Sequence, residues 1–259
     1  MVVLTDIHFT KMHGAGNDFV MVDDRAETFP IGVIAKVAPR GVGIGCEGVI
    51  LVQNSDCADF KMRFFNPDGS EADLCGNGAR CVAKFARDIG AVNSDQMRFE
   101  TRAGIVSAEI VASDSVKISL PDPKDLRSGF INTGVPHAIV EVGEINDADV
   151  ANEGRRIRFS PEFAPDGTNV DFVSFNPPST LSIRTYERGV EAETGACGTG
   201  SVASALIGVA QYSLRFPVKV TTLHGYELVV DGKWSEGKFS SVTLTGPVKT
   251  VYEGVLPID

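Results

Sequence analysis

Short runs of β-branched and aromatic residues alternate along the chain with two longer segments of helical periodicity. Apolar residues recur at positions i, i+3, i+4 and i+7 from Val82 and again from Val202, which predicts two helices. The second helix is apolar on nearly every face, which is typical of a helix buried on all sides. Five further runs predict strands by their length and β-branched content: residues 19–22, 49–52, 61–65, 116–120 and 138–142.

The same motif precedes both predicted helices. Cys75 begins Cys-Gly-Asn-Gly-Ala, and Cys197 begins Cys-Gly-Thr-Gly-Ser, an offset of 197 − 75 = 122 residues. Residues 99–104 and 220–225 also resemble each other, with an offset of 225 − 104 = 121. A period of about half the chain is too long for a solenoid repeat, so it indicates an internal duplication.

The duplication predicts an α+β fold of two pseudo-symmetric domains, each a β-sheet or barrel wrapped around a central α-helix. We place the N-terminal half at residues 1–119 plus 249–259 and the C-terminal half at residues 120–248. Residues 121–123, Pro-Asp-Pro, are the predicted linker, because proline disfavours both a helix interior and a central strand.

The composition and charge of the chain limit its expected binding partners and its expected cellular compartment. The net charge of −10 and the pI of about 4.9 argue against nucleic acid or an anionic membrane as the main partner. The first residues lack the features of a signal peptide, and no run approaches the roughly 18–20 apolar residues that span a bilayer. Five cysteines in a long chain do not suggest a secreted disulfide framework, so we expect a cytoplasmic protein with free thiols.

Two of the five cysteines carry the candidate chemistry. The first turn of a helix offers unpaired N–H groups and a partial positive charge, which bind a carboxylate and favour a thiolate. Cys75 and Cys197 each precede such a turn, with glycines that allow close approach of a ligand. Two such thiols suit removal of an α-proton from one face of an amino acid and its return to the other, with no cofactor and no metal. Cys46, Cys57 and Cys81 are interpreted as small buried structural residues.

Around these cysteines the sequence resembles diaminopimelate epimerase. The resemblance rests on an ordered set of blocks from about residue 7 to about residue 250, and no single motif carries it. The blocks are residues 9–19, 65–71, 75–81, 134–137, 167–169, 186–189 and 194–200. The resemblance implies an active site in a cleft between the halves and interconversion of LL- and meso-diaminopimelate, on the route to lysine and peptidoglycan. It also makes a homodimer the expected assembly.

The resemblance implies roles for particular residues. Cys75 and Cys197 are the expected acid–base pair, and His137 is a possible supporting residue beside a cysteine. The expected substrate ligands are Asn17, Asn66, Asn169, Glu187 and Arg188, with helix-terminus donors at Gly76, Asn77, Gly198 and Thr199. Arg188 suits the distal carboxylate, because a guanidinium pairs with a carboxylate through two hydrogen bonds.

Two positions depart from the family pattern and leave the substrate open. Val135 replaces an asparagine that is common in the family, and Gly48 falls at a position that is glutamine in some members. A related racemase of proline, hydroxyproline, histidine or lysine therefore stays an alternative, as does a non-catalytic amino-acid-binding protein. Residues 43–48 also fit the dinucleotide pattern G-x-G-x-x-G, but a predicted strand follows where that motif requires a helix. No spacing typical of a zinc site is present.

Overall fold

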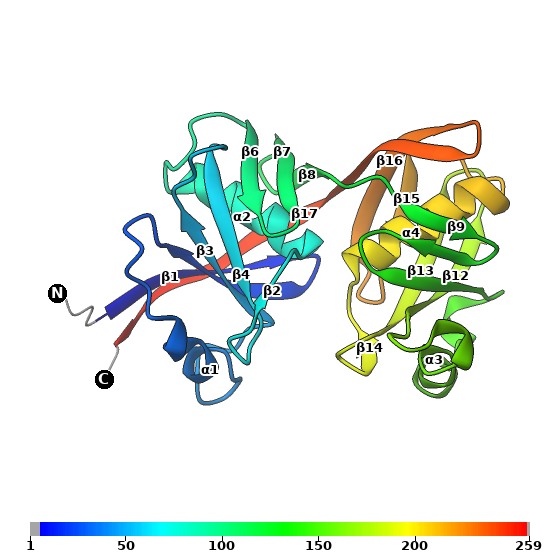
Figure 1. The fold of residues 1–259 in the computed structure, drawn as a ribbon, viewed down its shortest axis with the longest axis horizontal. Coiled ribbons are helices and arrows are strands. Elements are labelled where there is room, and N and C mark those ends of the chain that lie inside the picture. The colour runs from blue at the N-terminus through cyan, green and yellow to red at the C-terminus, as the bar shows by residue number, and fades with distance from the viewer. Residues whose placement is uncertain (1–5, 258–259) are drawn as a thin grey trace. The chain divides into compact units, whose positions relative to one another are not determined.

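The computed structural model describes residues 6–257. Contacts between Cα atoms divide the chain into two compact units, Met1–Ile118 with Gly246–Asp259, and Ser119–Thr245. The predicted boundaries fall one residue later at the first crossing and three residues later at the second. The second crossing lies within one continuous strand, β17 (Lys238–Pro257), at Gly246-Pro247, and the strand continues through it. Figure 1 labels the elements of each unit.

The first unit is a closed barrel. Its strands pair in the order β17–β1–β2–β3–β4–β6–β7–β8, and β8 pairs with β17 to complete the ring. These strands are β1 (Asp6–Gly14), β2 (Asn17–Asp23), β3 (Gly48–Gln53), β4 (Phe60–Phe65), β6 (Gln96–Thr101), β7 (Gly104–Ala112) and β8 (Ser115–Ser119). The two-residue strand β5 (Glu71–Ala72) pairs with the end of β4. The short elements η1 (Ile31–Val33) and α1 (Ile34–Val37) connect β2 to β3.

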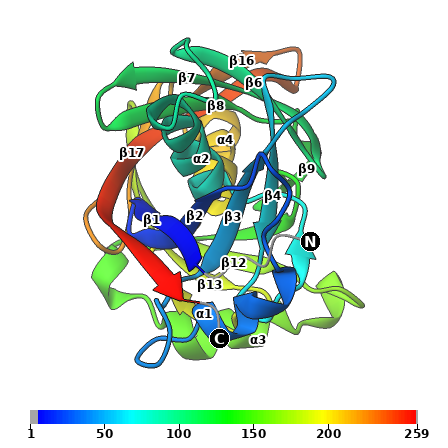
Figure 2. The ribbon, with the colours of Figure 1, turned by 90° about the vertical axis from the view of Figure 1, so that its left-hand side faces the viewer.

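Helix α2 (Gly76–Asp88) fills this barrel, and Figure 2 shows the strands around it. It contacts β1, β2, β3, β4 and β7. Residues 76–83, Phe85 and Ala86 are buried; the apolar spacing accounts for Val82, Phe85 and Ala86, whereas the first turns are buried on every side. The predicted helix and the strands predicted at 19–22, 49–52, 61–65 and 116–120 are confirmed.

The second unit repeats this architecture. Its strands pair in the order β9–β10–β11–β12–β13–β15–β16–β17, with β14 attached to β13 as β5 is attached to β4. The strands are β9 (Lys124–Arg127), β10 (Phe130–Asn132), β11 (Pro136–Glu141), β12 (Asn169–Asn176), β13 (Thr180–Glu187), β14 (Ala192–Thr194), β15 (Val218–Thr221) and β16 (Glu227–Ser235). The Leu120 N–H, just before β9, donates to the Val242 carbonyl of β17 at 3.0 Å.

Helix α4 (Gly198–Gln211) occupies the centre of the second unit and contacts β10, β11, β12, β13, β15 and β16. Gly198 and residues 200–208 are buried, as the all-round apolar sequence predicts. Helix α3 (Val150–Arg158), with η2 (Ile145–Asp147) and η3 (Pro161–Phe163), connects the parallel strands β11 and β12. The connection from β2 to β3 is its counterpart in the first unit. The predicted fold class, two pseudo-symmetric halves each wrapped around a helix, is confirmed.

Among residues 6–257, no helix is both long and apolar enough to cross a membrane.

Candidate active site

The two duplicated cysteines occupy the same structural position in their units. Each is the N-cap of the central helix, with extended backbone at Cys75 (φ −129°, ψ 121°) and at Cys197 (φ −107°, ψ 112°). The Cys75 carbonyl accepts from the Ala79 N–H at 2.7 Å, and the Cys197 carbonyl accepts from Ser201 at 3.0 Å. Each thiol therefore lies beside a helix first turn, where backbone N–H groups have no partner within the helix.

The thiol of Cys197 is buried and held by its own helix. The Gly200 N–H donates to its Sγ at 3.3 Å, and the Thr199 Oγ1 lies 3.5 Å from the same sulfur. Burial raises the pKa of Cys197 well above its usual value, and the negative charges of Glu187 and Asp171 raise it further. The hydrogen bonds from Thr199 and Gly200 oppose this shift but do not reverse it.

The helix terminus does favour the thiolate of Cys197, through the Gly200 N–H, but burial and the two carboxylates outweigh it and the pKa is raised. The partial positive charge of a helix end is worth on the order of 1 kcal/mol. Transfer of a charged group into a dry environment beside two carboxylates costs more than that. The raised pKa of Cys197 favours its neutral thiol, the form that donates a proton. Cys75, by contrast, is only half-buried.

A buried polar network underlies the start of α4. The Nδ1 atom of His137 lies 2.7 Å from one carboxylate oxygen of Asp171, and both side chains are fully buried. The Thr185 hydroxyl donates to the other carboxylate oxygen at 2.7 Å. A Cβ atom added to Gly200 would lie 2.4 Å from that second oxygen, so only glycine lets the helix approach the carboxylate so closely. His137, predicted to support a cysteine, is thus joined to a carboxylate whose charge acts on Cys197.

Sequence reasoning missed Asp171 and Thr185. The available signal was a carboxylate inside an otherwise apolar run, Val170-Asp171-Phe172-Val173. A charged residue at such a position is buried only when it is paired or hydrogen-bonded, and that exception usually has a function.

Asn169 and Arg188 are joined at the ends of neighbouring strands. The Asn169 Oδ1 accepts from the Arg188 N–H at 2.7 Å, and its Nδ2 donates to the Pro136 carbonyl at 3.3 Å. The Arg188 guanidinium donates to the Asp166 carbonyl at 3.5 Å. Within residues 6–257 no carboxylate lies within ion-pair distance of this guanidinium. Glu187 ends β13, immediately before Arg188, and its charge acts on Cys197.

The predicted ligands of the first unit lie at the ends of β2 and β4 and in the first turn of α2. Asn17 begins β2, and its Oδ1 is buried with no hydrogen-bond partner. Asn66 follows β4 in a turn, where its Nδ2 donates to the Ser70 hydroxyl at 3.0 Å. Gly76 and Asn77 begin α2, and the Asn77 Oδ1 accepts from Arg80 at 2.8 Å. Gly198 and Thr199 occupy the matching first turn of α4.

Gly48 cannot be replaced by a longer ligand on this backbone. A Cβ atom there would lie 2.4 Å from the Phe64 ring and 2.9 Å from the Phe65 carbonyl. The position at which some family members have glutamine is therefore closed to a side chain. Val135 is half-buried and brings no polar side-chain group.

All five cysteines are free, as predicted. Cys46 and Cys81 are buried, and burial raises the pKa of Cys81 to about 12. The interpretation of Cys57 as a buried residue is wrong. Cys57 is exposed in the turn between β3 and β4, where its thiol donates to Glu100 at 3.8 Å. A turn between two strands is solvent-exposed whatever the residue type.

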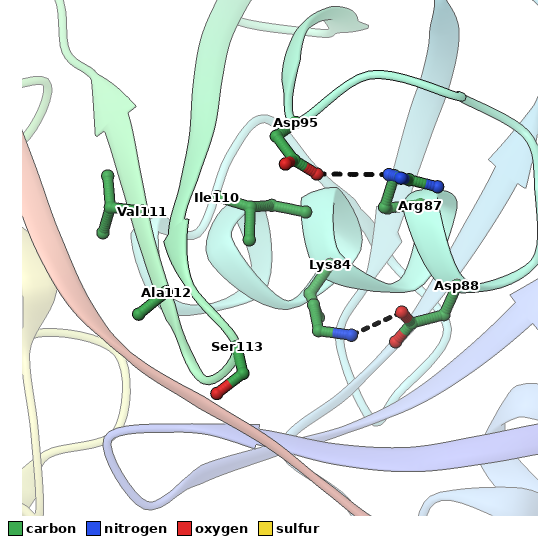
Figure 3. A pocket seen from close by; sticks show the side chains of 8 residues that line it. All are labelled: Lys84, Arg87, Asp88, Asp95, Ile110, Val111, Ala112 and Ser113. Carbon is green, nitrogen blue, oxygen red and sulfur yellow. Dashed lines mark hydrogen bonds and ion pairs between the residues drawn. The ribbon is translucent and has the colours of Figure 1, made fainter.

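Other ligand sites suggested by sequence patterns find little support. Residues 43–48 lead into strand β3, which removes the dinucleotide interpretation. In the part of the chain that the structure describes, no three His, Cys, Asp or Glu side chains are grouped as metal ligands. A hollow between the second half of α2 and the β7–β8 hairpin is shown in Figure 3. Its charges are paired, Lys84 with Asp88 and Arg87 with Asp95, so we assign it no ligand.

Solved structures share the fold of this chain. A phenazine biosynthesis protein of the PhzF family from Bacillus anthracis superposes with a TM-score of 0.77 at 17% identity, over 98% of this chain and 100% of that one. A hydroxyproline epimerase from Agrobacterium vitis gives a TM-score of 0.68 at 17% identity, over 100% and 94%. The fold is therefore one that an amino-acid epimerase uses, with a cysteine at the start of each central helix in this chain.

Sequence relatives identify the family to which the chain belongs. A diaminopimelate epimerase family model matches residues 9–124 and 129–251. The diaminopimelate epimerase of Aquifex aeolicus (strain VF5) is 42% identical over 276 aligned residues, covering 96% of this chain and 98% of that protein. The chain belongs to the diaminopimelate epimerase family and is an isomerase of the epimerase and racemase class.

Proposed function

We propose that this enzyme interconverts LL- and meso-diaminopimelate through a thiolate and a thiol, Cys75 and Cys197, without a cofactor. The observation that carries the proposal is the position of both cysteines as N-caps of the two central helices. Each thiol then has a carboxylate-binding helix end beside it. Diaminopimelate is the proposed substrate because these relatives are named diaminopimelate epimerase.

The proposed step moves one proton on each face of the α-carbon. A thiolate takes the α-proton, so the C–H bond breaks, an S–H bond forms and the electron pair spreads into the carboxylate. The opposite thiol then donates its proton to the carbanion from the other side. First-turn N–H groups at Gly76, Asn77, Gly198 and Thr199 stabilise the charge that develops on the carboxylate. The neutral state of Cys197 suits the donor role in one direction.

The distal end of diaminopimelate carries a second ammonium and a second carboxylate. Arg188 supports selectivity for that carboxylate, because its guanidinium has no carboxylate partner among the described residues. Glu187 and the side-chain oxygens of Asn17, Asn66 and Asn169 are the proposed acceptors for ammonium groups. The unpaired Asn17 Oδ1 is buried and suits this role.

Arg188→Ala should raise KM for diaminopimelate about 100-fold or more while kcat falls less, because the lost ion pair forms before and during the reaction alike. Steady-state kinetics would show this split. Arg156→Ala is the matched control, since Arg156 is exposed and pairs only with Glu153 of its own helix. An unchanged KM in Arg188→Ala would remove Arg188 from the substrate site.

The activity itself is tested by incubating the enzyme with LL-diaminopimelate in D₂O under reducing conditions. We expect meso product carrying deuterium at the α-carbon. Exchange with proline, hydroxyproline, histidine or lysine but not with diaminopimelate would establish the related racemase instead. Binding of diaminopimelate without any exchange would establish a non-catalytic binding protein.

We further propose a cytoplasmic role in lysine and peptidoglycan precursor synthesis, supported by the five free thiols and by the family. The homodimer stays a prediction.

A further inference from the structure

A fully buried arginine lies in the central helix of the first unit. Arg80 has no exposed surface. Because side chains in a helix lean toward its N-terminus, the guanidinium reaches back over the first turn. Nη1 donates to the Gly76 carbonyl at 3.2 Å, and Nη2 donates to the Asn77 Oδ1 at 2.8 Å. The Nε atom is buried with no hydrogen-bond partner.

Arg80 lacks a carboxylate counter-ion. No acidic side chain in residues 6–257 forms an ion pair with it, although arginine stays protonated in proteins and a buried unpaired charge is costly. Burial lowers the pKa of Arg80, and negative charge on Cys81 and Cys75 opposes that shift. The pKa of Cys81 is about 12, so Cys81 is a neutral thiol near pH 7. Of these two thiols, Cys75 is therefore the one that can supply the missing negative charge.

The strands that pack on Gly78, in the first turn of α2, do so through apolar side chains. A Cβ atom added to Gly78 would meet Ile50, Met62 and Phe19, which come from β3, β4 and β2.

The second unit reverses this pattern position by position. Val202 stands where Arg80 stands, since each is five residues after its cysteine. Phe19 pairs with Gly48 in β2 and β3, and His137 pairs with Asn169 in β11 and β12, so His137 corresponds to Phe19. Asp171, two residues after Asn169, corresponds to Ile50, two residues after Gly48. The glycines agree, because Gly78 packs against Ile50 and Gly200 against Asp171. The charges of Asp171 in β12 and Glu187 in β13 thus act on Cys197. His137 of β11 is joined to Asp171, and His224 packs against nearby Gly195.

We propose that Arg80 is a positioning residue that holds Cys75 as the resting thiolate, while burial and the carboxylates of Glu187 and Asp171 hold Cys197 as the resting thiol. This rests on the proposed two-thiol function and specifies the proton state in which the free enzyme waits. One thiol then begins as the base and the other as the acid, so the free enzyme is prepared for one direction of the reaction. Arg80 acts through Cys75, since its buried guanidinium has no surface to offer a substrate.

The test is alkylation by iodoacetamide as a function of pH, with each cysteine peptide quantified by mass spectrometry. Thiolate is the reactive form, so the midpoint of each rate profile reports the proton state of that thiol. We expect the Cys75 midpoint to lie at least one pH unit below the Cys197 midpoint in the unaltered protein. Arg80→Met should slow Cys75 alkylation at pH 7 about tenfold, because an adjacent opposite charge shifts a pKa by ~1–3 units.

Controls separate charge from structure. Arg80→Lys keeps the charge and should restore the Cys75 midpoint toward that of the unaltered protein. Arg87→Met makes the same change on the surface of α2 and should leave the midpoint unmoved. Asp171→Asn should lower the Cys197 midpoint. Cys57 is an exposed internal reference in every sample.

Equal midpoints for Cys75 and Cys197 would overturn the proposal, and so would an unchanged Cys75 midpoint in folded Arg80→Met. Should Arg80→Met fail to fold, the comparison of the two midpoints in the unaltered protein still decides. Alkylation needs no substrate, so this result is independent of whether diaminopimelate is turned over.

Discussion

Cys75→Ala and Cys197→Ala should each lower the epimerisation rate by at least about 10³-fold, with the fold intact. Removal of either thiol leaves one face of the α-carbon with no proton donor or acceptor, and general acid–base catalysis is typically worth 10²–10⁴-fold. Groups that act as a unit fail together, so the double variant should be little worse than either single variant. Chiral chromatography of the diaminopimelate isomers measures the rates.

Cys57→Ala is the control for this pair. It makes the same substitution at an exposed thiol far from either helix N-cap in sequence, and it should keep full activity. More than a tenth of the original rate in either Cys75→Ala or Cys197→Ala would rule out the two-thiol scheme.

Gly200→Ala should destabilise the protein by about 2–3 kcal/mol. The new methyl group would lie 2.4 Å from a carboxylate oxygen of Asp171, and His137 and Thr185 hold that carboxylate from behind. Overpacking of a buried site typically costs ~1–3 kcal/mol. Displacement of the Asp171 carboxylate also breaks its hydrogen bonds, which destabilises the protein further. The better helix propensity of alanine opposes this loss by ~1 kcal/mol. Urea denaturation measures the difference.

Gly78→Ala is the matched variant in the first unit. The nearest atom to its added methyl group is the Cδ1 methyl of Ile50, at 2.7 Å, which can move by a rotamer change. We therefore expect a loss smaller by at least about 1 kcal/mol than in Gly200→Ala. Gly32→Ala, with nothing within 4 Å, should leave the free energy of unfolding nearly unchanged. Equal losses at positions 78 and 200 would contradict the account of the Asp171 contact.

The fold was largely predictable because the duplication is visible in short sequence patterns. The spacing of apolar residues after Cys75 and Cys197 located both helices, and the repeated Cys-Gly-x-Gly motif identified them as equivalent. The continuous strand β17 was harder, because its buried and half-buried residues alternate without a break where it passes from one unit to the other. The periodicity of apolar residues predicts single helices and strands, but it does not indicate to which unit a strand belongs.

The electrostatics of the site could not be predicted from the motif. The two cysteine motifs are nearly the same, yet the residues that distinguish the thiols come from other elements. The charge of Asp171, which is hydrogen-bonded to His137, acts on Cys197, and the counterparts of both residues in the first unit are apolar. A helix end beside a thiol is a local feature, whereas burial and neighbouring carboxylates depend on the tertiary fold.

The position of newly introduced deuterium at early times tests the two-thiol account most directly. LL-diaminopimelate is incubated with the enzyme in D₂O, and the reaction is stopped after a small fraction has turned over. Because one thiol removes the proton and the other delivers a solvent-derived deuteron, we predict α-deuterium in the meso product and almost none in the remaining LL-substrate. Comparable early labelling of substrate and product would indicate a single base that serves both faces, and it would contradict the account.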